Sequence, residues 1–328
     1  MASRLRSFDG AGDPGRQAII AARANKIANR LIDRWRRQPQ TAPDLWFTYH
    51  LYYKAPDWIG SKVCSALGMS YVVAEASVAM KRAVGPWATG HRAVVDALHR
   101  ADLVIGLNPV DREGVQPFIA PGAWAALPPF LDTRLYREAP RVPDGPARLV
   151  TVAMMRPGDK LASYRLLGAA LAQLLDLEWT LEIIGDGPAR CDVEATLALL
   201  GPRVSFVGEA GETEVAARLA VADLFVWPAI NEAFGMAMLE AQASALAVVA
   251  GNSGGVGTIV AGGQTGLLVP PGDAAIFAAA VRQLIEDPAR CTALGEAARR
   301  KVAREHDLAA ASRRLGGLIE PTRLRRAS

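Results

Sequence analysis

The 328-residue sequence predicts an α/β protein with two domains, and three observations carry this prediction. Short apolar runs alternate with helical stretches along the whole chain, which is typical of parallel sheets covered by helices. A hydrophobic content of 51% is enough to form two cores. Residues 138–147 are rich in Pro and Gly and read as an interdomain linker. We therefore expect two Rossmann-like domains that face each other across a cleft.

The expected strands are the apolar runs themselves. In the first half they are residues 45–49, 71–74 and 103–107, and in the second half residues 149–154, 181–184, 204–207, 224–227, 247–250 and 267–269. The expected domains are residues 1–143 and 144–305, followed by a C-terminal helix and basic tail at 306–328. Ligands of such sheets bind beyond the carboxyl ends of the strands, which is where Arg156, Gly185 and Glu232 fall.

Cysteine usage and hydropathy predict a cytoplasmic protein. Cys64, Cys191 and Cys291 are far apart, which disfavours a zinc site or a disulfide framework and suits a reducing compartment. No stretch approaches the roughly 20 apolar residues of a membrane-spanning helix, and residues 1–6 lack the apolar core of a signal peptide.

Basic residues cluster twice, although the formal net charge is only +4. Both clusters consist of arginines: 30, 34, 36 and 37 in the first, and 313, 314, 323, 325 and 326 in the second. Two interpretations stay open: solvated helix faces, or peripheral attraction to an anionic inner membrane surface, worth about 1 kcal/mol per basic residue. Nucleic-acid binding is not expected, because no aromatic residues are interleaved with the basic ones.

The run N-E-A-F-G-M-A-M-L-E at residues 231–240 is the most informative part of the sequence. It follows the apolar strand 224–227 and Pro228, so the order is strand, loop and helix N-terminus. A helix start offers backbone N–H groups and a positive dipole end, which suit an anionic diphosphate. Carboxylates at Glu232 and Glu240 can bind sugar hydroxyls.

Glu240 is expected to lie in a largely buried helix, because residues 235–250 are nearly all apolar or small. A buried carboxylate needs a partner or a ligand, since an unpaired desolvated ion costs several kcal/mol. Glu240 therefore either binds a ligand or makes a structural pair or cap. Glu232, in a loop, either binds a ligand or is simply solvated.

The motif E-x-F-G-x-x-x-L-E resembles the two-glutamate signature of GT-B glycosyltransferases, specifically the retaining glycosyltransferase family 4. Four further segments resemble family motifs in the right order: residues 149–160, 181–188, 204–208 and 262–273. The resemblance covers residues 148–305 and implies a GT-B fold with a nucleotide-sugar donor site in the second domain.

The resemblance assigns donor-binding roles to two cations. Arg156 and Lys160 would bind the donor diphosphate and stabilise the charge that develops as it leaves. A planar guanidinium and a point cation can neutralise a pyrophosphate without metal, and the sequence has no D-x-D triplet. We therefore expect neither metal nor cofactor. The Arg-to-Lys spacing is one residue tighter than the common family pattern, and without the resemblance both side chains would read as solvated cations.

The resemblance also assigns the remaining donor contacts. Glu232 would bind hydroxyls of the donor sugar, and Glu240 would accept from the ribose hydroxyls. Backbone groups would line the sugar and phosphates in the turn at Gly185 and in the loop at Ala233, Phe234 and Gly235.

Three departures from the family pattern stand out. The family proline after the Glu240 helix is absent at residues 245–249, and the G-G motif at residues 254–258 lacks its later acid. In the first domain, Glu75 replaces a family histidine beside the reacting sugar. Glu75 either binds an acceptor hydroxyl or is a polar strand end, and His50 either touches the acceptor or is structural.

The expected function is that of a retaining glycosyltransferase. It would move a sugar from a nucleotide-sugar donor to a glycan or lipid-linked acceptor in cell-surface polysaccharide or glycoconjugate synthesis. Two alternatives stay open: a non-catalytic nucleotide-sugar-binding protein, and a nucleotide-sugar epimerase of the same fold.

The first domain is expected to be incomplete. A GT-B first domain should open with an apolar strand and a glycine-rich turn, whereas residues 1–10 are polar and basic and the first strand arrives at residue 45. We expect the DNA upstream of the assigned start to encode, in frame, an apolar strand and a glycine-rich loop. We also expect the 328-residue chain to bind nucleotide but to transfer sugar poorly.

Overall fold

The computed structural model describes residues 3–136 and 145–324, without the side chains of 323 and 324. Most of the expected linker and Arg325 and Arg326 lie outside the described residues. The chain divides into two compact units: unit 1 comprises residues 1–127 and 312–328, and unit 2 comprises residues 128–311.

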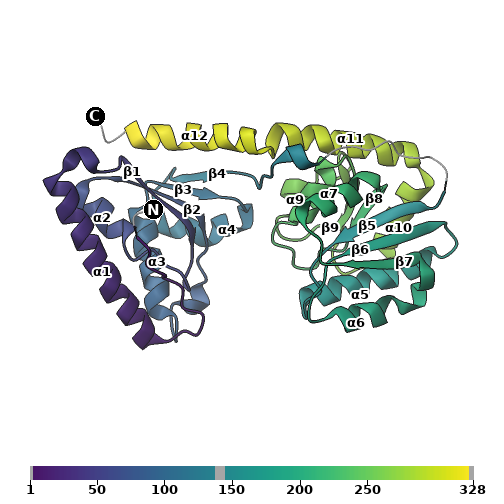
Figure 1. Cartoon of the computed structure of the whole chain (residues 1–328), viewed down its shortest axis with the longest axis horizontal. Helices are drawn as coiled ribbons and strands as arrows, with labels where there is room; N and C mark the ends of the chain where they lie inside the picture. Colours follow the sequence, from purple (N-terminus) through teal and green to yellow (C-terminus); the bar gives the residue numbers. More distant parts are fainter. Residues whose placement is uncertain (1–2, 137–144, 325–328) are drawn as a thin grey trace. The chain divides into compact units, whose positions relative to one another are not determined.

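Unit 1 contains a four-stranded parallel sheet of order β1-β2-β3-β4, with β1 at one edge (Figure 1). Its strands are β1 (Leu45–Leu51), β2 (Ser70–Ala76), β3 (Leu103–Gly106) and β4 (Trp124–Ala126). Its helices are α1 (Pro14–Arg37), α2 (Gly60–Leu67), α3 (Ala88–Arg100) and α4 (Pro109–Val115). All three strands predicted in this half are present, and β4 is an addition.

Helix α1 shows how the sequence builds this unit. Asp13 caps the helix by accepting from the N–H groups of Gly15 and Arg16, and Pro14 occupies the first turn, where no N–H is needed. The buried residues recur at helical spacing and face the core: Ile20, Ala24, Ala28 and Ile32. The four arginines of the first basic cluster lie on the exposed remainder of the helix.

Unit 2 contains a six-stranded parallel sheet of order β10-β9-β8-β5-β6-β7. Its strands are β5 (Ala147–Val152), β6 (Trp179–Ile184), β7 (Val204–Gly208), β8 (Leu224–Trp227), β9 (Ala247–Gly251) and β10 (Gly266–Val269). Its helices are α5 (Asp159–Leu171), α6 (Arg190–Leu197), α7 (Glu212–Val221), α8 (Met236–Ala243), α9 (Val256–Ile259), α10 (Ala274–Glu286) and α11 (Pro288–Glu305). Helix α12 (Leu308–Leu324) follows, and its residues from 312 onward group with unit 1.

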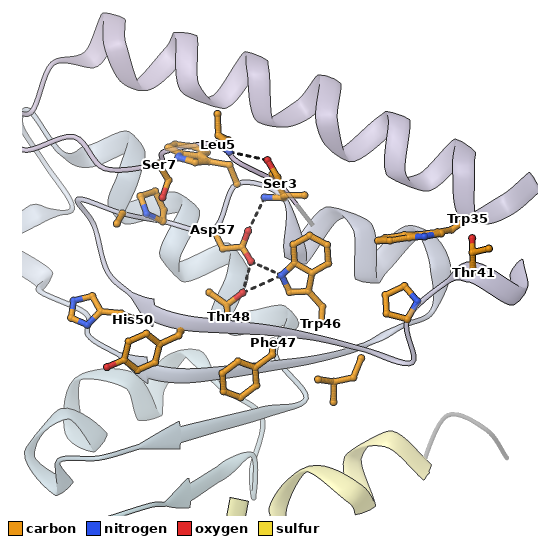
Figure 2. Close-up of a pocket in the computed structure, with 17 residues that line it drawn as sticks. Ser3, Leu5, Ser7, Trp35, Thr41, Trp46, Phe47, Thr48, His50 and Asp57 are labelled. Carbon is orange, nitrogen blue, oxygen red and sulfur yellow. Dashed lines mark hydrogen bonds between the residues drawn. The ribbon is translucent and has the colours of Figure 1, made fainter. Parts of the chain in front are cut away.

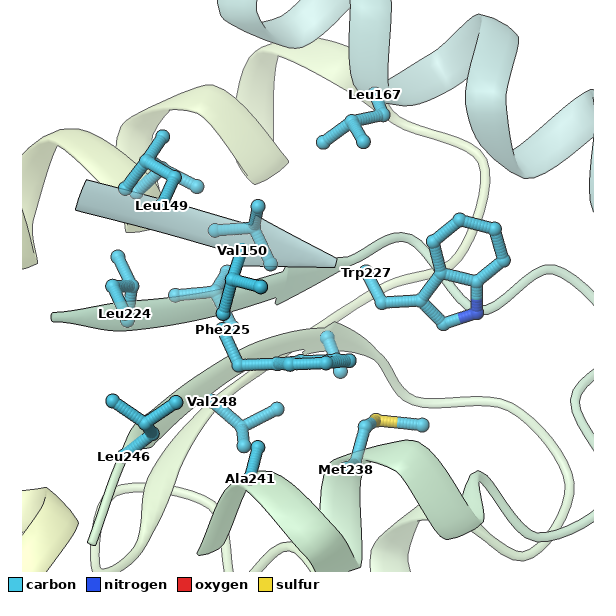
Figure 3. Packing of buried hydrophobic residues seen from close by; sticks show 14 of the residues in the cluster. Leu149, Val150, Leu167, Leu224, Phe225, Trp227, Met238, Ala241, Leu246 and Val248 are labelled. Atoms are coloured by element: carbon cyan, nitrogen blue, oxygen red, sulfur yellow. The ribbon is translucent and has the colours of Figure 1, made fainter. Parts of the chain in front are cut away.

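The core of unit 2 fills both faces of its sheet. Figure 3 shows Leu167 of α5 and Met238 of α8 on opposite sides of β5 and β8. Phe225 and Val150 of these central strands are fully buried. Burying one such side chain contributes about 1.5–3 kcal/mol, so the core holds the carboxyl ends of the strands in fixed register. All six strands predicted here are present, and the α/β class with parallel sheets is confirmed.

Candidate functional site

The loop between β8 and α8, residues 228–235, is fixed to the N-terminal turn of α5. The N–H of Ile230 donates to Ser163 Oγ at 3.0 Å, and Asn231 Nδ2 donates to Asp159 Oδ2 at 2.8 Å. Strands β5 and β8 are neighbours in the sheet, so the segments that follow their carboxyl ends meet. The sequence motifs at 149–160 and 231–240 therefore form one site.

Lys160 and Glu232 form an ion pair across this contact. Lys160 Nζ donates to Glu232 Oε2 at 2.5 Å, and the side chains are only 27% and 15% exposed. Trp227 Nε1 donates to the same oxygen at 3.2 Å, and its ring centroid lies 5.4 Å from Lys160 Nζ. The carboxylate is thus fixed by two donors, and the solvated interpretation of Glu232 is wrong.

The backbone of the loop is strained in two places. Ala229 and Asn231 have φ values of 55° and 49°, which are uncommon for residues with a side chain. Such strain costs of order 1–3 kcal/mol per residue and persists only where the surroundings enforce it. The contacts with α5 provide that enforcement.

Gly254 and Gly255 support the loop from the other side. A Cβ on Gly254 would lie 2.0 Å from the carbonyl oxygen of Glu232, and the N–H of Gly255 donates to the carbonyl of Ala233 at 2.9 Å. The G-G motif therefore has a packing role in this chain even without the later acid of the family pattern.

Glu240 lies on α8 with no hydrogen bond or ion pair to its carboxylate from any described residue. Burial raises the pKa of this carboxyl to about 7, and the charge of Glu212 raises it further. The structural pair considered from the sequence is absent from the described part of the chain. Glu240 is consequently an uncommitted acceptor inside a desolvated site.

The N-terminus of α8 adds backbone donors. Gly235, with φ 78°, precedes the helix, and within the described residues the N–H groups of Phe234 and Gly235 have no hydrogen-bond acceptor. Ala233 is fixed through its carbonyl by Gly255. An anion at this helix start would meet free N–H groups and the positive dipole end.

Arg156 follows the carboxyl end of β5, and Gly185 follows that of the neighbouring strand β6. Arg156 is exposed, and no described carboxylate forms an ion pair with it. Gly185 has φ 143°, and a Cβ there would lie 2.1 Å from the carbonyl oxygen of Ala153. Its N–H already donates to the carbonyl of Gly208 at 2.8 Å. Gly185 therefore shapes the turn by close backbone approach.

In unit 1, His50 and Glu75 lie together at the carboxyl ends of β1 and β2. His50 Nδ1 is 3.2 Å from Glu75 Oε2, and both residues have positive φ values, 61° and 58°. A hydrogen bond with Glu75 raises the pKa of Tyr49, with burial adding to it. Burial, followed by the charge of Glu75, raises the pKa of Asp111, which lies in the first turn of α4.

Asp111 was not predicted from the sequence. The available signal was its place at the start of a helix just after β3, where a third strand end adds to those of β1 and β2.

A hollow of about 680 Å³ lies beside β1 in unit 1 (Figure 2). Aromatic side chains line much of it: Trp35, Trp46, Phe47, Tyr49 and Trp58. Asp57 Oδ2 accepts from Trp46 Nε1, Thr48 Oγ1 and the Tyr71 hydroxyl at 3.0, 2.6 and 2.9 Å, so this carboxylate is saturated and structural.

No group of three or more His, Cys, Asp or Glu side chains among the described residues could hold a metal ion. No described helix has the length and apolarity to cross a membrane.

The fold of the chain is similar to that of several solved glycosyltransferase structures. The structure of sucrose-phosphate synthase from Thermosynechococcus elongatus is similar with a TM-score of 0.68 and 23% identity, covering 92% of this chain and 79% of that one. Anabaena HepE in complex with UDP is similar with a TM-score of 0.73 and 18% identity, covering 90% and 82%. Both are similar in fold, and the predicted GT-B fold class is confirmed.

The profile of the family described as glycosyl transferases group 1 matches residues 134–301, about half of the chain. The chain belongs to this family. A D-inositol 3-phosphate glycosyltransferase from Kineococcus radiotolerans is 33% identical over 243 residues, covering 65% of this chain and 55% of the relative. Glycogen synthase from Mycobacterium tuberculosis strain H37Rv is 42% identical over 102 residues, covering 31% and 25%. The chain thus matches from about a quarter to about half of the length of these relatives.

Proposed function

We propose that the chain transfers a sugar from a nucleoside diphosphate sugar to an acceptor hydroxyl, with retention and without metal. The observation that carries this proposal is the Lys160–Glu232 pair at 2.5 Å, formed between α5 and the loop that leads into α8. We assign the cation of this pair to phosphate and its carboxylate to sugar hydroxyls, both at one point of unit 2. Anabaena HepE, which is similar in fold, has been crystallised with UDP and with UDP-glucose, so UDP is the first nucleotide to test.

In the reaction, the bond between the sugar's anomeric carbon and the diphosphate oxygen breaks, and its electron pair stays on the diphosphate. Arg156 and Lys160 stabilise that charge, Lys160 with the N–H groups it does not give to Glu232. The acceptor oxygen bonds to the same face of the anomeric carbon, and its proton passes to the leaving phosphate oxygen.

Glu232 and Glu240 would bind different parts of the donor. Glu232, already ordered by Lys160 and Trp227, would accept from the sugar hydroxyls. Glu240 would accept from the ribose hydroxyls, and the N–H groups of Phe234 and Gly235 would meet the phosphates. The turn at Gly185 would line the nucleotide beside Arg156.

The acceptor would be a glycan or a lipid-linked molecule bound by unit 1. Glu75, held by His50, is suited to accept a hydrogen bond from the reacting hydroxyl. The exposed arginines of α1 would allow peripheral contact with an anionic membrane from the cytoplasmic side, in cell-surface polysaccharide or glycoconjugate synthesis.

Thermal unfolding with UDP, with and without a chelator, tests the donor site. At a ligand concentration of one hundred times Kd, binding to the folded state alone should stabilise by about 2.7 kcal/mol, and chelator should not reduce the effect. Lys160→Ala should abolish most of it, whereas Arg165→Ala, an exposed change on the same helix, should not. A stabilisation that disappears in chelator would contradict the metal-free site.

Product analysis tests the chemistry. Glycosylated acceptor supports transfer. Nucleotide binding without any product would instead indicate a non-catalytic binding protein, for which the missing acid after Gly254 and Gly255 argues. Release of an epimerised sugar nucleotide would indicate an epimerase.

A further inference from the structure

Two cations of unit 1 share one pair of aromatic rings. Lys54, which follows β1, has its Nζ 5.9 Å from the ring centroid of Tyr53 and 5.5 Å from that of Trp87. Arg82, at the end of the 3₁₀ helix η2 (Met80–Arg82) that follows β2, has its Cζ 5.3 and 4.6 Å from the same centroids. The two rings themselves pack edge to face with their centroids 5.5 Å apart. Both cations therefore contact the same two rings.

Nothing in the described part of the chain neutralises these two cations. No described carboxylate lies within 4.0 Å of either side chain, and Arg82 Nε is buried with no hydrogen-bond partner. Like charges repel, and a buried guanidinium N–H without an acceptor costs about 1–3 kcal/mol or more. The aromatic faces offset part of this cost, but they supply no lone pairs for the N–H groups.

Asp9 is close to the cluster, yet its carboxylate is committed elsewhere. Its backbone carbonyl accepts from Trp87 Nε1 at 3.4 Å, while its carboxylate accepts from Gln17 Nε2 and from the N–H groups of Ala11 and Asp13. Burial works to raise the pKa of Asp9, but these hydrogen bonds lower it below its ordinary value, and neither cation contributes. Within the described residues, no carboxylate therefore supplies a counter-charge to Lys54 or Arg82.

We propose that Lys54 and Arg82 bind a phosphate group of the acceptor substrate. A phosphate ester supplies both the negative charge and several acceptor oxygens, which match the fork of Arg82 and the point charge of Lys54. This inference rests on the proposed transferase function, because it describes the acceptor of that reaction.

The position of the cluster fits this role. His50, paired with Glu75, packs edge to face on Tyr52 with centroids 4.7 Å apart, and Tyr52 contacts Tyr53 at 5.8 Å. Lys54 and Arg82 follow the same two strands, β1 and β2, whose carboxyl ends carry His50 and Glu75. An acceptor whose hydroxyl meets Glu75 would thus extend its phosphate along these rings, so the acceptor class is a phosphorylated sugar or polyol, free or as a lipid headgroup.

Phosphate binding is measured by thermal unfolding and tryptophan fluorescence at constant ionic strength, with UDP present to occupy the donor site. Inorganic phosphate and glycerol phosphate are the soluble probes. Wild type should respond, and the double variant Lys54→Gln with Arg82→Gln should need at least tenfold more phosphate. The matched control is Lys62→Gln, an exposed lysine of α2 whose only described side-chain partner is Asn25, and it should behave as wild type.

Two conservative single variants distinguish loss of phosphate binding from a folding defect. Lys54→Arg keeps the charge and should keep the response, while Trp87→Phe should remove much of the fluorescence change. Equal responses of wild type and the double glutamine variant would overturn the proposal.

Vesicles distinguish the source of the phosphate. Cosedimentation with phosphatidylglycerol vesicles but not with phosphatidylcholine vesicles, lost in the double variant, indicates a lipid headgroup, whereas a response to soluble esters alone indicates a soluble phosphorylated acceptor. No response to any probe, while UDP still stabilises the chain, would overturn the anion site and leave the donor proposal intact. A phosphate response without any UDP effect would support the anion site and contradict the donor proposal.

Discussion

Lys160 Nζ lies 2.5 Å from Glu232 Oε2, so a cation from α5 and a carboxylate from the loop after β8 form a pair. The pair is mostly buried and is braced by Trp227. In the proposed reaction, this pairing would lower the cost of orienting both groups toward the diphosphate and the sugar. It also means that removing either side chain leaves the other without its ion-pair partner.

The first prediction concerns this coupling. Lys160→Ala should reduce transfer by about a hundredfold or more, because it removes a cation from the leaving group. Glu232→Gln should lower kcat with little change in UDP affinity, since its sugar contacts strengthen in the transition state. The double variant should be non-additive by about 0.5–3 kcal/mol. Transfer kinetics and UDP titration of all four proteins measure the cycle, and small additive effects would contradict the pairing.

The second prediction is that Glu240→Gln stabilises the empty protein at high pH. Burial and the charge of Glu212 raise the pKa of Glu240 from 4.5 to about 7, so the folded state holds this proton more tightly than the unfolded chain does. Stability contributed by the protonated form is therefore lost as the pH rises across that interval. At pH 8 the variant should exceed wild type by on the order of 1–3 kcal/mol, and the gap should narrow toward pH 4.5.

The same variant should bind UDP more weakly, because an ionised ribose acceptor has been replaced by a neutral one. Denaturant unfolding at several pH values and UDP titration test the two effects separately. A pH-independent difference would show that Glu240 does not titrate in this range, and unchanged UDP affinity would remove it from the ribose site.

The sequence predicted nine of the ten strands in the described residues, and it singled out Lys160 and Glu232, because apolar runs and short motifs are local signals. Each strand except β4 is an apolar run, and β4 has only three residues, too few for a pattern. Lys160 and Glu232 were each found from short motifs. Their pairing could not be predicted, because it depends on β5 and β8 being neighbours in the sheet.

Interactions between distant segments account for what was missed. Asp111 approaches Glu75 only because β2 and β3 are adjacent. The support given by Gly254 to the Glu232 carbonyl is likewise a contact between segments that are far apart in sequence. The cluster of Lys54 and Arg82 on Trp87 joins two separate connections of unit 1, after β1 and after β2, and has no local motif.

The third prediction is that Asp57→Ala destabilises unit 1. Its carboxylate accepts three side-chain hydrogen bonds at Oδ2, and its Oδ1 accepts from the N–H groups of Ile59 and Gly60 at 2.9 and 2.8 Å. Removing this carboxylate leaves several partly buried donors without an acceptor, which should lower the free energy of unfolding by about 3 kcal/mol. Asp96→Ala, an exposed change on α3, is the control. Thermal unfolding with UDP should still detect donor binding, and an unchanged melting temperature would contradict the network.

The last prediction separates backbone strain from steric support at the donor site. Gly254 and Gly263 both have positive φ, 53° and 74°, so alanine at either position should cost about 1 kcal/mol of backbone strain. Only at Gly254 would the new Cβ collide with backbone, 2.0 Å from the Glu232 carbonyl, whereas at Gly263 nothing lies within 4 Å. Gly254→Ala must therefore displace the strained loop and disturb the Lys160–Glu232 pair, and a shift of about 1 Å at such a site can cost a hundredfold in rate. Gly263→Ala should lower only the stability of the protein and should keep the wild-type transfer rate. If both variants retain full activity, the contact between Gly254 and the loop does not position Glu232.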